Sequence, residues 1–330
     1  MRTEAIVFTE ADSIACRSVE TPDLQPGQAL VRALVNHVST GTETRILRGG
    51  QPGAEFPCVP GYSAVGVVED VCETEACAKG DLVFVPYALS PVGLHGAWGT
   101  HAGHMVVPAE SLLRLDERRT PAEYAFSNVA AVALHGVRRT FSRADDTAVV
   151  VGQGLIGLLH SRIQVAMGRR VIGVDVLPWR LERSLAGGVL KAVDAREGDV
   201  ESAVKEIWAR GVQVAVEASG RQEGLNTCAA VLRSRGRGPD DRIPVLLVQS
   251  SIMGRVTLDA RQAFVKDYML VNSRSTDPCD LPGAIRMIGS GALPVQDLIT
   301  LRARPQDAAD AYRELLEHPE CHMTCIFDWE

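Results

Sequence analysis

Three glycines have the most informative spacing in the chain: Gly152, Gly154 and Gly157 in the segment VVVGQGLIGLLH. In such a GxGxxG run the first glycine permits a tight turn, the second lets a phosphate approach the backbone, and the third allows close packing of helix on strand. The helix that follows offers free backbone N–H groups and the positive end of its dipole to an anion. The predicted pyrophosphate-binding turn consists of Gly152, Gln153, Gly154, Leu155, Ile156 and Gly157.

A carboxylate follows at the spacing expected of a dinucleotide-binding unit. Asp175 stands eighteen residues after Gly157, at the end of the next apolar run, with Val176 beside it. A carboxylate there accepts hydrogen bonds from ribose hydroxyls and repels a 2′-phosphate, which favours NAD over NADP. Arg180 argues the other way, because its guanidinium could reach a 2′-phosphate. We predict an NAD site, and a glycine turn that serves packing alone is the alternative.

Two later strand ends complete the predicted cofactor site. Ala218, Ser219 and Gly220 follow one apolar run, and small residues there let a ribose pass close to the backbone. Gln249 and Ser250 end the next run. The carboxyl ends of parallel strands share one crevice, so we expect both groups to line it. For the last pair an ordinary polar strand end is an equal alternative.

The elements that position these residues differ between the two halves of the chain. Short β-branched runs punctuated by Pro-Gly pairs precede residue 115, which is typical of a small barrel or sandwich. Continuous apolar runs alternate with helical stretches from residue 147, which predicts a parallel sheet covered on both faces. The expected strands are 5–8, 29–35, 64–71, 82–85, 105–107, 147–151, 171–174, 212–218, 245–248, 298–301 and 325–329. One helical stretch is expected to follow the glycine turn and to end at Met167. Further helices are expected over 178–186, 222–232 and 307–316, and a polar loop is expected over 235–242.

Composition restricts the possible partners. The 330 residues carry a net charge of −7 with Lys and Arg scattered, so neither nucleic acid nor a membrane surface is an expected partner. We find no apolar run long enough for a membrane span and no signal peptide, and we expect a cytoplasmic protein. The eight cysteines form no Cys-x-x-Cys pair, so they predict free thiols and no structural zinc.

The order of motifs along the chain resembles the medium-chain dehydrogenase/reductase superfamily. The motifs are VRALVNHVSTGTETRILRGG, PCVPGYSAVGVVEDV, GDLVFV, GTHAGHMVVPAESLLRLDE and AAVALHGVRR, followed by the glycine turn. The resemblance implies an α/β protein with a GroES-like β-rich domain formed by residues 1–120 and 292–330. A Rossmann doubly wound domain over 121–291 is implied beside it, with a small-molecule substrate between the two. Pairing of nucleotide domains into a homodimer is also implied.

The departures from the family pattern concern its catalytic zinc. Zinc-dependent members have Cys-Gly-Thr-Asp where this chain has Thr40-Gly41-Thr42-Glu43, and Gly-His-Glu where it has Gly61-Tyr62-Ser63. Their acidic ligand falls near Asn128, and their four-cysteine lobe is missing. Catalytic zinc needs three thiolate, imidazole or carboxylate ligands, so we expect no metal. Together with the terminal Ile-Phe-Asp-Trp, the pattern resembles the zinc-free branch that includes bacteriochlorophyllide a dehydrogenase.

Without zinc, hydrogen-bond donors and a proton acceptor must handle the substrate oxygen. The resemblance places Thr42 at the start of the family's proton relay. Tyr62 stands at the former zinc-ligand position as a donor, Glu43 is a base or holds a neighbouring hydroxyl, and Ser39 and Thr40 are further donors. Each has a structural alternative: a helix cap for Ser39 and Thr42, space filling for Tyr62, and a salt bridge to Arg45 or Arg48 for Glu43.

Three functions fit these residues. The leading one is NAD-dependent hydride transfer between nicotinamide and a secondary alcohol or ketone of a polyol-like or other small metabolite. A second is an NAD(P)H-dependent ene or quinone reductase, against which Asp175 counts. A third is an NAD-binding sensor or scaffold without turnover. A zinc site built from His37, His95, His101 and His104 is a weaker alternative, because their spacing matches no ligand pattern.

Overall fold

The computed structural model describes residues 1–238, 241–252 and 254–329, and the chain divides into two compact units. The first unit comprises Met1–Asn128, Ile285–Ser290 and Val295–Glu330. The second comprises Val129–Ala284 and Gly291–Pro294. Within the predicted loop over 235–242, residues 239 and 240 lie outside the described part. The first unit is thus built from both ends of the chain.

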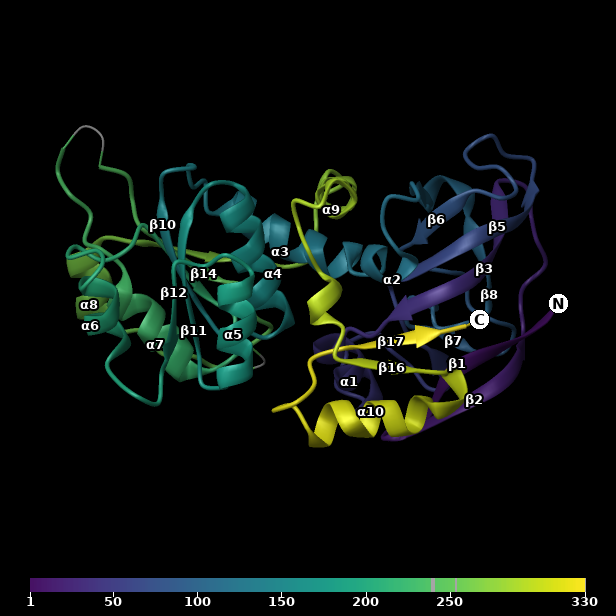
Figure 1. The fold of residues 1–330 in the computed structure, drawn as a ribbon. Helices are drawn as coiled ribbons and strands as arrows, with labels where there is room; N and C mark the ends of the chain where they lie inside the picture. Colours follow the sequence, from purple (N-terminus) through teal and green to yellow (C-terminus); the bar gives the residue numbers. More distant parts are fainter. Residues whose placement is uncertain (239–240, 253, 330) are drawn as a thin grey trace. The chain divides into compact units, whose positions relative to one another are not determined.

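Two sheets form the β-rich first unit (Figure 1). The smaller has the strand order β2-β1-β4-β7, with β1 and β2 antiparallel. The larger has the order β16-β17-β3-β5-β6-β9, and β8 also pairs with β3. The strands are β1 (Arg2–Glu10), β2 (Ser13–Glu20), β3 (Gln28–His37), β4 (Cys58–Val59), β5 (Ala64–Cys72), β6 (Leu82–Val85), β7 (His95–Gly96), β8 (His104–Pro108), β9 (Leu113–Arg114), β16 (Leu301–Ala303) and β17 (Cys325–Asp328).

The C-terminal strand β17 lies between β16 and β3, so the end of the chain completes the larger sheet. It runs antiparallel to β3, with Ile326 opposite His37. The short helix α1 (Thr40–Leu47) follows β3 directly, and α2 (Pro121–Tyr124) begins with a capping box at Thr120. Helix α10 (Ala308–Glu317) lies along β16 and β17 in Figure 1 and buries one face, including Tyr312.

The second unit contains a six-stranded parallel sheet in the order β12-β11-β10-β13-β14-β15. Its central strands are buried along almost their whole length, which explains their continuous apolar sequences. The strands are β10 (Thr147–Val151), β11 (Arg170–Asp175), β12 (Lys191–Asp194), β13 (Val214–Glu217), β14 (Val245–Val248) and β15 (Met269–Asn272). The helices are α3 (Ser127–Arg139), α4 (Leu155–Ala166), α5 (Pro178–Ala186), α6 (Val200–Lys205), α7 (Gln222–Val231), α8 (Ala260–Lys266) and α9 (Asp280–Ser290), of which α3 and α9 also extend into the first unit.

The predicted fold class is confirmed: a GroES-like β-rich unit and a Rossmann-type parallel sheet. Several local predictions need correction. The strand expected over 298–301 begins later than predicted: Leu298 ends a 3-10 helix, Gln296–Leu298, residues 299 and 300 belong to no helix or strand, and β16 begins at Leu301. The sequence analysis also missed β2, β12 and β15, which are partly exposed and so lack a continuous apolar run.

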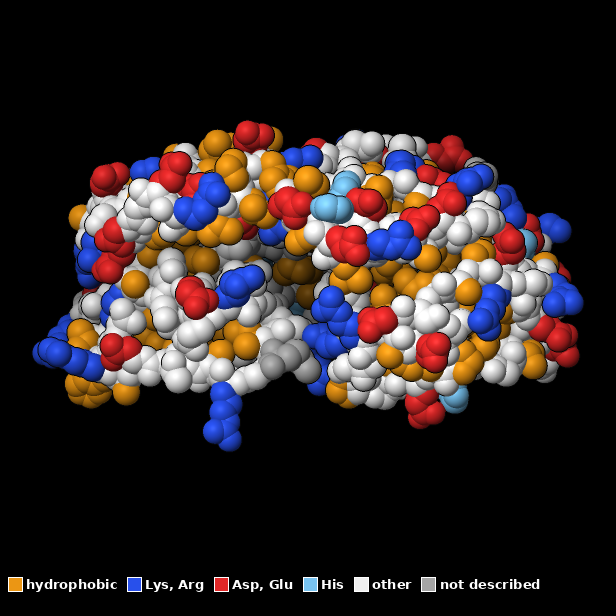
Figure 2. Space-filling view, turned by 90° about the horizontal axis from the view of Figure 1, so that it is seen from below, with side chains coloured by type: hydrophobic (Ala, Val, Ile, Leu, Met, Phe, Trp, Pro, Cys, Tyr) orange, Lys and Arg blue, Asp and Glu red, His pale blue; other side chains and the backbone are white. Residues whose placement is uncertain are grey.

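In the part of the chain that the structure describes, no helix is long and apolar enough to cross a membrane. Acidic and basic side chains are interspersed on the face that Figure 2 presents. That distribution agrees with the scattered charges of the sequence, which form no continuous basic field.

Candidate nucleotide site and candidate catalytic residues

The glycine turn connects β10 to α4 with geometry that only glycine fits. Gly152 has a φ of +92°, and a Cβ there would lie 2.6 Å from the backbone nitrogen of Ser219. A Cβ on Gly157 would lie 1.8 Å from the carbonyl oxygen of Gly152. Gly154 is the N-cap of α4, and Leu155 and Ile156 form its first turn. The turn therefore brings free backbone N–H groups to the carboxyl edge of the sheet, as a pyrophosphate site requires.

Asp175 ends β11 and bonds to the same turn. Its Oδ2 accepts the Gln153 backbone N–H at 2.5 Å, and its Oδ1 accepts those of Val176 and Leu177 at 2.7 and 3.0 Å. A carboxylate has about four acceptor positions, so Oδ2 retains one for a further donor such as a ribose hydroxyl. The Arg180 guanidinium lies 4.0 Å from Oδ2 and stacks on Trp179.

The Gln153 side chain turns away from this edge and into the fold. Its Nε2 donates to the Val150 carbonyl at 2.8 Å, and its Oε1 accepts the hydroxyls of Ser184 and Ser161 at 2.9 and 3.2 Å. The side chain is fully buried. Gln153 therefore offers its backbone to a ligand, while its side chain fixes the turn on α4 and α5.

The loops after β13 and β14 meet through a residue that the sequence analysis did not select. Glu217, fully buried at the end of β13, accepts the backbone N–H groups of Ser219 and Gly220 and the hydroxyl of Ser250. Ala218 donates its backbone N–H to Val151 of β10. The structure thus brings the predicted residues of both loops together, and Glu217 is the group that joins them.

Gln249 differs from the other residues of this group. Its Nε2 donates to the Val132 carbonyl of α3 at 3.2 Å, and its buried Oε1 has no partner among the described residues. A Cβ on Gly136 would meet this oxygen at 1.6 Å. The Gln249 side chain therefore packs against α3, and its neighbour Ser250 bonds to Glu217.

In the first unit, the candidate catalytic residues gather at the start of α1. Ser39 is the N-cap, and the phenol of Tyr62 donates a hydrogen bond to its Oγ. Thr40 Oγ1 donates to the Met323 carbonyl at 2.6 Å, next to β17. Thr42 follows in the first turn, with its backbone N–H directed to the Ser39 carbonyl. The start of α1 thus carries three hydroxyls, and Tyr62, from the segment before β5, brings its phenol against that of Ser39.

The environment of Tyr62 changes its acidity. Burial raises the pKa of the phenol, the nearby charge of Glu43 raises it further, and hydrogen bonding with Ser39 and Thr42 opposes the change. The Tyr62 ring meets the edge of Trp98 at 5.4 Å between centroids. With the pKa raised above its ordinary value of about 10, the phenol is protonated at neutral pH and acts as a hydrogen-bond donor.

Glu43 lies beneath this loop and is fully buried. One oxygen accepts the Ser39 backbone N–H at 2.8 Å, and the other bonds to His101 Nε2 at 2.9 Å and to the Tyr312 hydroxyl. The predicted alternative of a pair with Arg45 is not observed, since Arg45 Nε donates to Gln51. Glu43 therefore positions Ser39. The sequence singled out His101 only as a weaker zinc candidate, and its contact with Glu43, like that of Tyr312, was not predicted because the partners lie 58 and 269 residues away.

The positions that match the family's zinc ligands do not fit that metal. Thr40 and Tyr62 donate hydrogen bonds to Met323 and Ser39. Asn128 donates from Nδ2 to the Tyr62 carbonyl at 2.8 Å. A hydroxyl, a phenol and a carboxamide replace the thiolate, imidazole or carboxylate ligands that zinc prefers.

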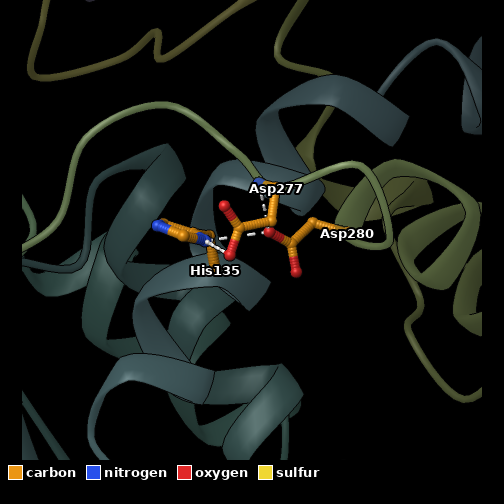
Figure 3. A group of neighbouring side chains, drawn as sticks. All are labelled: His135, Asp277 and Asp280. Atoms are coloured by element: carbon orange, nitrogen blue, oxygen red, sulfur yellow. Dashed lines mark hydrogen bonds and ion pairs between the residues drawn. The ribbon is translucent and has the colours of Figure 1, made fainter.

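One group of side chains elsewhere has the composition of a metal site. His135 of α3 points towards Asp277 and Asp280 at the start of α9, with ligand atoms within 4.8 Å of one another (Figure 3). Asp280, however, already bonds to His135 Nδ1 at 2.9 Å, to the Arg138 guanidinium and to the Asp277 backbone N–H. These donors satisfy the buried carboxylate, so an ion-pair network accounts for the group without a metal.

Two domain families match this chain. The model described as "Alcohol dehydrogenase GroES-like domain" matches residues 25–117, and the one described as "Zinc-binding dehydrogenase" matches residues 156–240. A 2-desacetyl-2-hydroxyethyl bacteriochlorophyllide A dehydrogenase from Rhodobacter capsulatus is 29% identical, with 100% of this chain and 99% of that protein covered. An erythritol/L-threitol dehydrogenase from Mycolicibacterium smegmatis is 27% identical, with 91% and 90% covered.

Solved structures of the same fold cover the whole chain. An alcohol dehydrogenase from Escherichia coli CFT073 complexed with NADH has a TM-score of 0.87 at 18% identity, covering 99% of both chains. A zinc-binding dehydrogenase from Sinorhizobium meliloti bound to NADP also has a TM-score of 0.87, at 19% identity and 100% coverage of both. At this level of identity the two structures show the fold. The family models and the relatives support an oxidoreductase of the medium-chain dehydrogenase/reductase type.

Proposed function

We propose that this protein is an NAD-dependent oxidoreductase that transfers a hydride between nicotinamide and a secondary alcohol or ketone without catalytic zinc. The observation that carries the proposal is the hydrogen bond between Tyr62 and Ser39, at a position where zinc-dependent relatives bind the metal. A phenol paired with a hydroxyl provides the proton chemistry that the metal would otherwise assist.

The mechanism assigns the proton to Tyr62. A bound nicotinamide supplies or accepts the hydride. In ketone reduction, the Tyr62 phenol would turn its O–H from Ser39 Oγ to the substrate oxygen and release the proton to the developing alkoxide. The Ser39 hydroxyl would then donate a hydrogen bond to the phenolate oxygen, and solvent water would return the proton to Tyr62. The Glu43 carboxylate holds the backbone N–H of Ser39, and the Asn128 side chain holds the backbone carbonyl of Tyr62.

The nucleotide would bind at the carboxyl edge of the parallel sheet in the second unit. The backbone at Gly152, Gly154 and Gly157 faces the pyrophosphate, and Asp175 accepts a ribose hydroxyl at its remaining acceptor position. The solved relatives include complexes with NADH and with NADP, so the choice between the two rests on Asp175. Its carboxylate would repel a 2′-phosphate, and this supports NAD.

The substrate class follows from the hydroxyl donors and from the relatives. The names of the two relatives specify a hydroxyethyl-bearing pigment and a sugar alcohol, and both names indicate a hydroxyl-bearing compound. The start of α1 provides the hydroxyls of Ser39, Thr40 and Thr42, and Tyr62 adds a phenol beside them. Such a group of hydroxyls suits a substrate with several hydroxyls. We therefore extend the proposal to polyol-like or other small hydroxylated metabolites.

We also propose a homodimer formed through the second unit. Strand β15 is the last strand of its sheet and exposes three of its four residues. Large apolar side chains are exposed on or near it, which is typical of a protein interface. They are Val256, Leu258, Phe264, Val265, Met269 and Leu270.

Calorimetric titration with NAD and NADP, on protein whose zinc content has been measured, tests the proposal directly. We expect binding of NAD with less than about a tenth of an equivalent of zinc, because the matched positions lack zinc ligands. A screen of secondary alcohols should then give NADH formation. Stoichiometric zinc at full activity would contradict the metal-free mechanism, and NAD binding without turnover would indicate a sensor or scaffold.

A substitution at Asp175 tests the cofactor preference. Asp175→Ser removes the carboxylate that repels a 2′-phosphate, so we expect NAD affinity to fall about tenfold and NADP affinity to rise. Asp194→Ser at the end of the neighbouring strand β12 is the matched control, because its carboxylate pairs with the exposed Arg196. If both variants alter NAD affinity equally, Asp175 does not determine the preference.

A further inference from the structure

Glu217 is a buried carboxylate without a cationic partner among the residues that the structure describes. Its Oε1 accepts the Ser219 backbone N–H at 2.7 Å, the Ser219 hydroxyl at 2.6 Å and the Gly220 backbone N–H at 2.8 Å. Its Oε2 accepts the Ser250 hydroxyl. Two backbone N–H groups and two serine hydroxyls therefore surround the carboxylate, and each of its oxygens accepts at least one hydrogen bond.

The position of Glu217 in the sheet relates it to one half of a dinucleotide. The strand order reverses between β10 and β13, and a dinucleotide spans the crevice at that point. Asp175 on β11 marks the adenosine side, so the nicotinamide half belongs to the side of β13 and β14. The loop after β13 also touches the glycine turn, since a Cβ on Gly152 would lie 2.6 Å from Ser219 N.

A negative charge at the end of β13, on the nicotinamide side, would interact differently with the oxidised and the reduced ring of the cofactor. The nicotinamide ring of NAD⁺ is cationic, and it becomes neutral when it accepts a hydride. Charges interact strongly in a buried environment, where water screens them poorly. The charge of Glu217 already acts on a buried neighbour: burial chiefly, and Glu217 in addition, raise the pKa of the Cys228 thiol.

We infer that the Glu217 carboxylate makes the site prefer NAD⁺ over NADH. The inference rests on the proposed NAD dependence and adds a redox preference to it. Tighter NAD⁺ binding and easier NADH release favour capture of the oxidised cofactor, as alcohol oxidation requires. Glu217 is thus a positioning residue for two loops and also a source of charge for the reacting ring.

Glu217→Gln separates the charge from the hydrogen bonds. The amide oxygen can accept the Ser219 and Gly220 donors, and the amide nitrogen can donate to Ser250 Oγ, so the loops keep their connections. We expect the dissociation constant of NAD⁺ to rise about tenfold more than that of NADH, which corresponds to a change of about 30 mV in the potential of the bound couple. Calorimetry for NAD⁺ and fluorescence titration for NADH measure the two constants.

Ser250→Ala is the matched control, because it removes one hydrogen bond and keeps the carboxylate. A purely structural effect of loosened loops should weaken NAD⁺ and NADH by the same factor in this variant. A second measurement uses the unmodified protein and does not depend on the folding of any variant. Benzamide adenine dinucleotide is an analogue of NAD⁺ whose ring carries no charge, and we expect it to bind more weakly than NAD⁺.

The outcomes distinguish this inference from the function on which it rests. Equal changes for NAD⁺ and NADH in Glu217→Gln, or equal binding of NAD⁺ and the benzamide analogue, would overturn the charge effect and leave NAD dependence intact. Failure of the unmodified protein to bind either NAD⁺ or NADH would overturn the proposed cofactor itself.

Discussion

Tyr62 and Ser39 come from different segments of the first unit, and the fold brings their oxygens into contact. The raised pKa keeps the Tyr62 phenol protonated at neutral pH, and Ser39 Oγ lies within hydrogen-bond distance of the phenol oxygen. Glu43 determines where Ser39 stands, through the Ser39 backbone N–H. In the mechanism that we propose, the phenol carries the proton chemistry, and Glu43 acts through its neighbour Ser39.

Tyr62→Phe removes the phenol oxygen and leaves the ring against Trp98. We expect kcat for ketone reduction to fall about 10²- to 10³-fold with little change in NADH affinity, because only the proton donor is lost. In the unmodified protein, kcat for reduction should decline as the pH rises through the raised pKa of Tyr62, above about 10. A pH profile of kcat for both proteins measures this.

The decline at high pH should be absent in Tyr62→Phe. Tyr87→Phe is the matched control, because Tyr87 is exposed and removal of its hydroxyl should leave kcat and its pH profile unchanged. Equal losses in the two variants, or an unaltered pH profile in Tyr62→Phe, would contradict a proton role for Tyr62.

At the scale of elements, the turn from β10 to α4 combines a steric requirement with the phosphate binding that we propose for it. Gly157 has no room for a side chain, whereas a Cβ on Gly154 would meet only Arg180 Nη1, at 3.9 Å. The two glycines should therefore respond differently to the same substitution. Gly157 serves the packing of helix on strand, and in the proposed site Gly154 allows the approach of a phosphate.

Gly154→Ala should keep the unfolding midpoint within about 2 °C and lower NAD affinity at least tenfold, since the added methyl group faces the pyrophosphate. Gly157→Ala should lower both stability and affinity, because its Cβ would lie 1.8 Å from the Gly152 carbonyl oxygen. Calorimetry measures the unfolding midpoint of each variant, and nucleotide titration measures its NAD affinity. Gly198→Ala, with open space around it, is the control. Loss of stability in Gly154→Ala would contradict this division of roles.

Helix α4 also contains a titratable group in its buried face. Burial lowers the pKa of His160 to about 3, with a contribution from Arg169, and its Nδ1 bonds to Gln164 at 3.0 Å. An unfolded histidine titrates near 6.5, so the unfolded state takes up more protons between pH 6.5 and 3. Stability from this neutral histidine is complete above pH 6.5 and is lost as the pH falls towards 3.

As the pH is lowered from 6 to 4, we expect the contribution of His160 to the free energy of unfolding to fall by about 1 kcal/mol per pH unit. His160→Gln cannot take up the proton, so its urea midpoint should depend less on pH than that of the unmodified protein. His95→Gln, at an exposed position, is the control. An identical pH dependence in all three proteins would show that His160 does not contribute.

The sequence predicted the elements whose apolar pattern or glycine spacing is local. Helix α5 was predicted over the residues that it occupies. The strands β6, β10 and β14 were also predicted with their observed bounds, because buried parallel or central strands have continuous apolar sequences. Pairs that form over long sequence distances carry no such signal. The contacts of Glu43 with His101 and Tyr312, and those of Glu217 with Ser250, could be found only from the structure.

For the whole molecule, the proposed homodimer depends on the exposed apolar segment around β15. Phe264→Glu combined with Leu270→Lys places two charges on that surface, and we expect a protein of half the assembled mass. Sedimentation velocity measures the mass. Leu185→Glu on the exposed face of α5 is the control and should leave the mass unchanged. A monomeric unmodified protein would contradict the proposed assembly.

The position of β17 between β3 and β16 has a consequence for synthesis on the ribosome. Domains commonly fold as they emerge, beginning at the N-terminus. Here the larger sheet of the first unit cannot close until residues 325–328 have left the exit tunnel, by which time the whole parallel sheet of the second unit has emerged. The part of β3 that pairs with β17, Val35 to His37, therefore stays open until β17 emerges, whereas the rest of β3 can pair earlier with β5 and β8. The nascent chain should be a substrate for chaperones that bind unpaired strands.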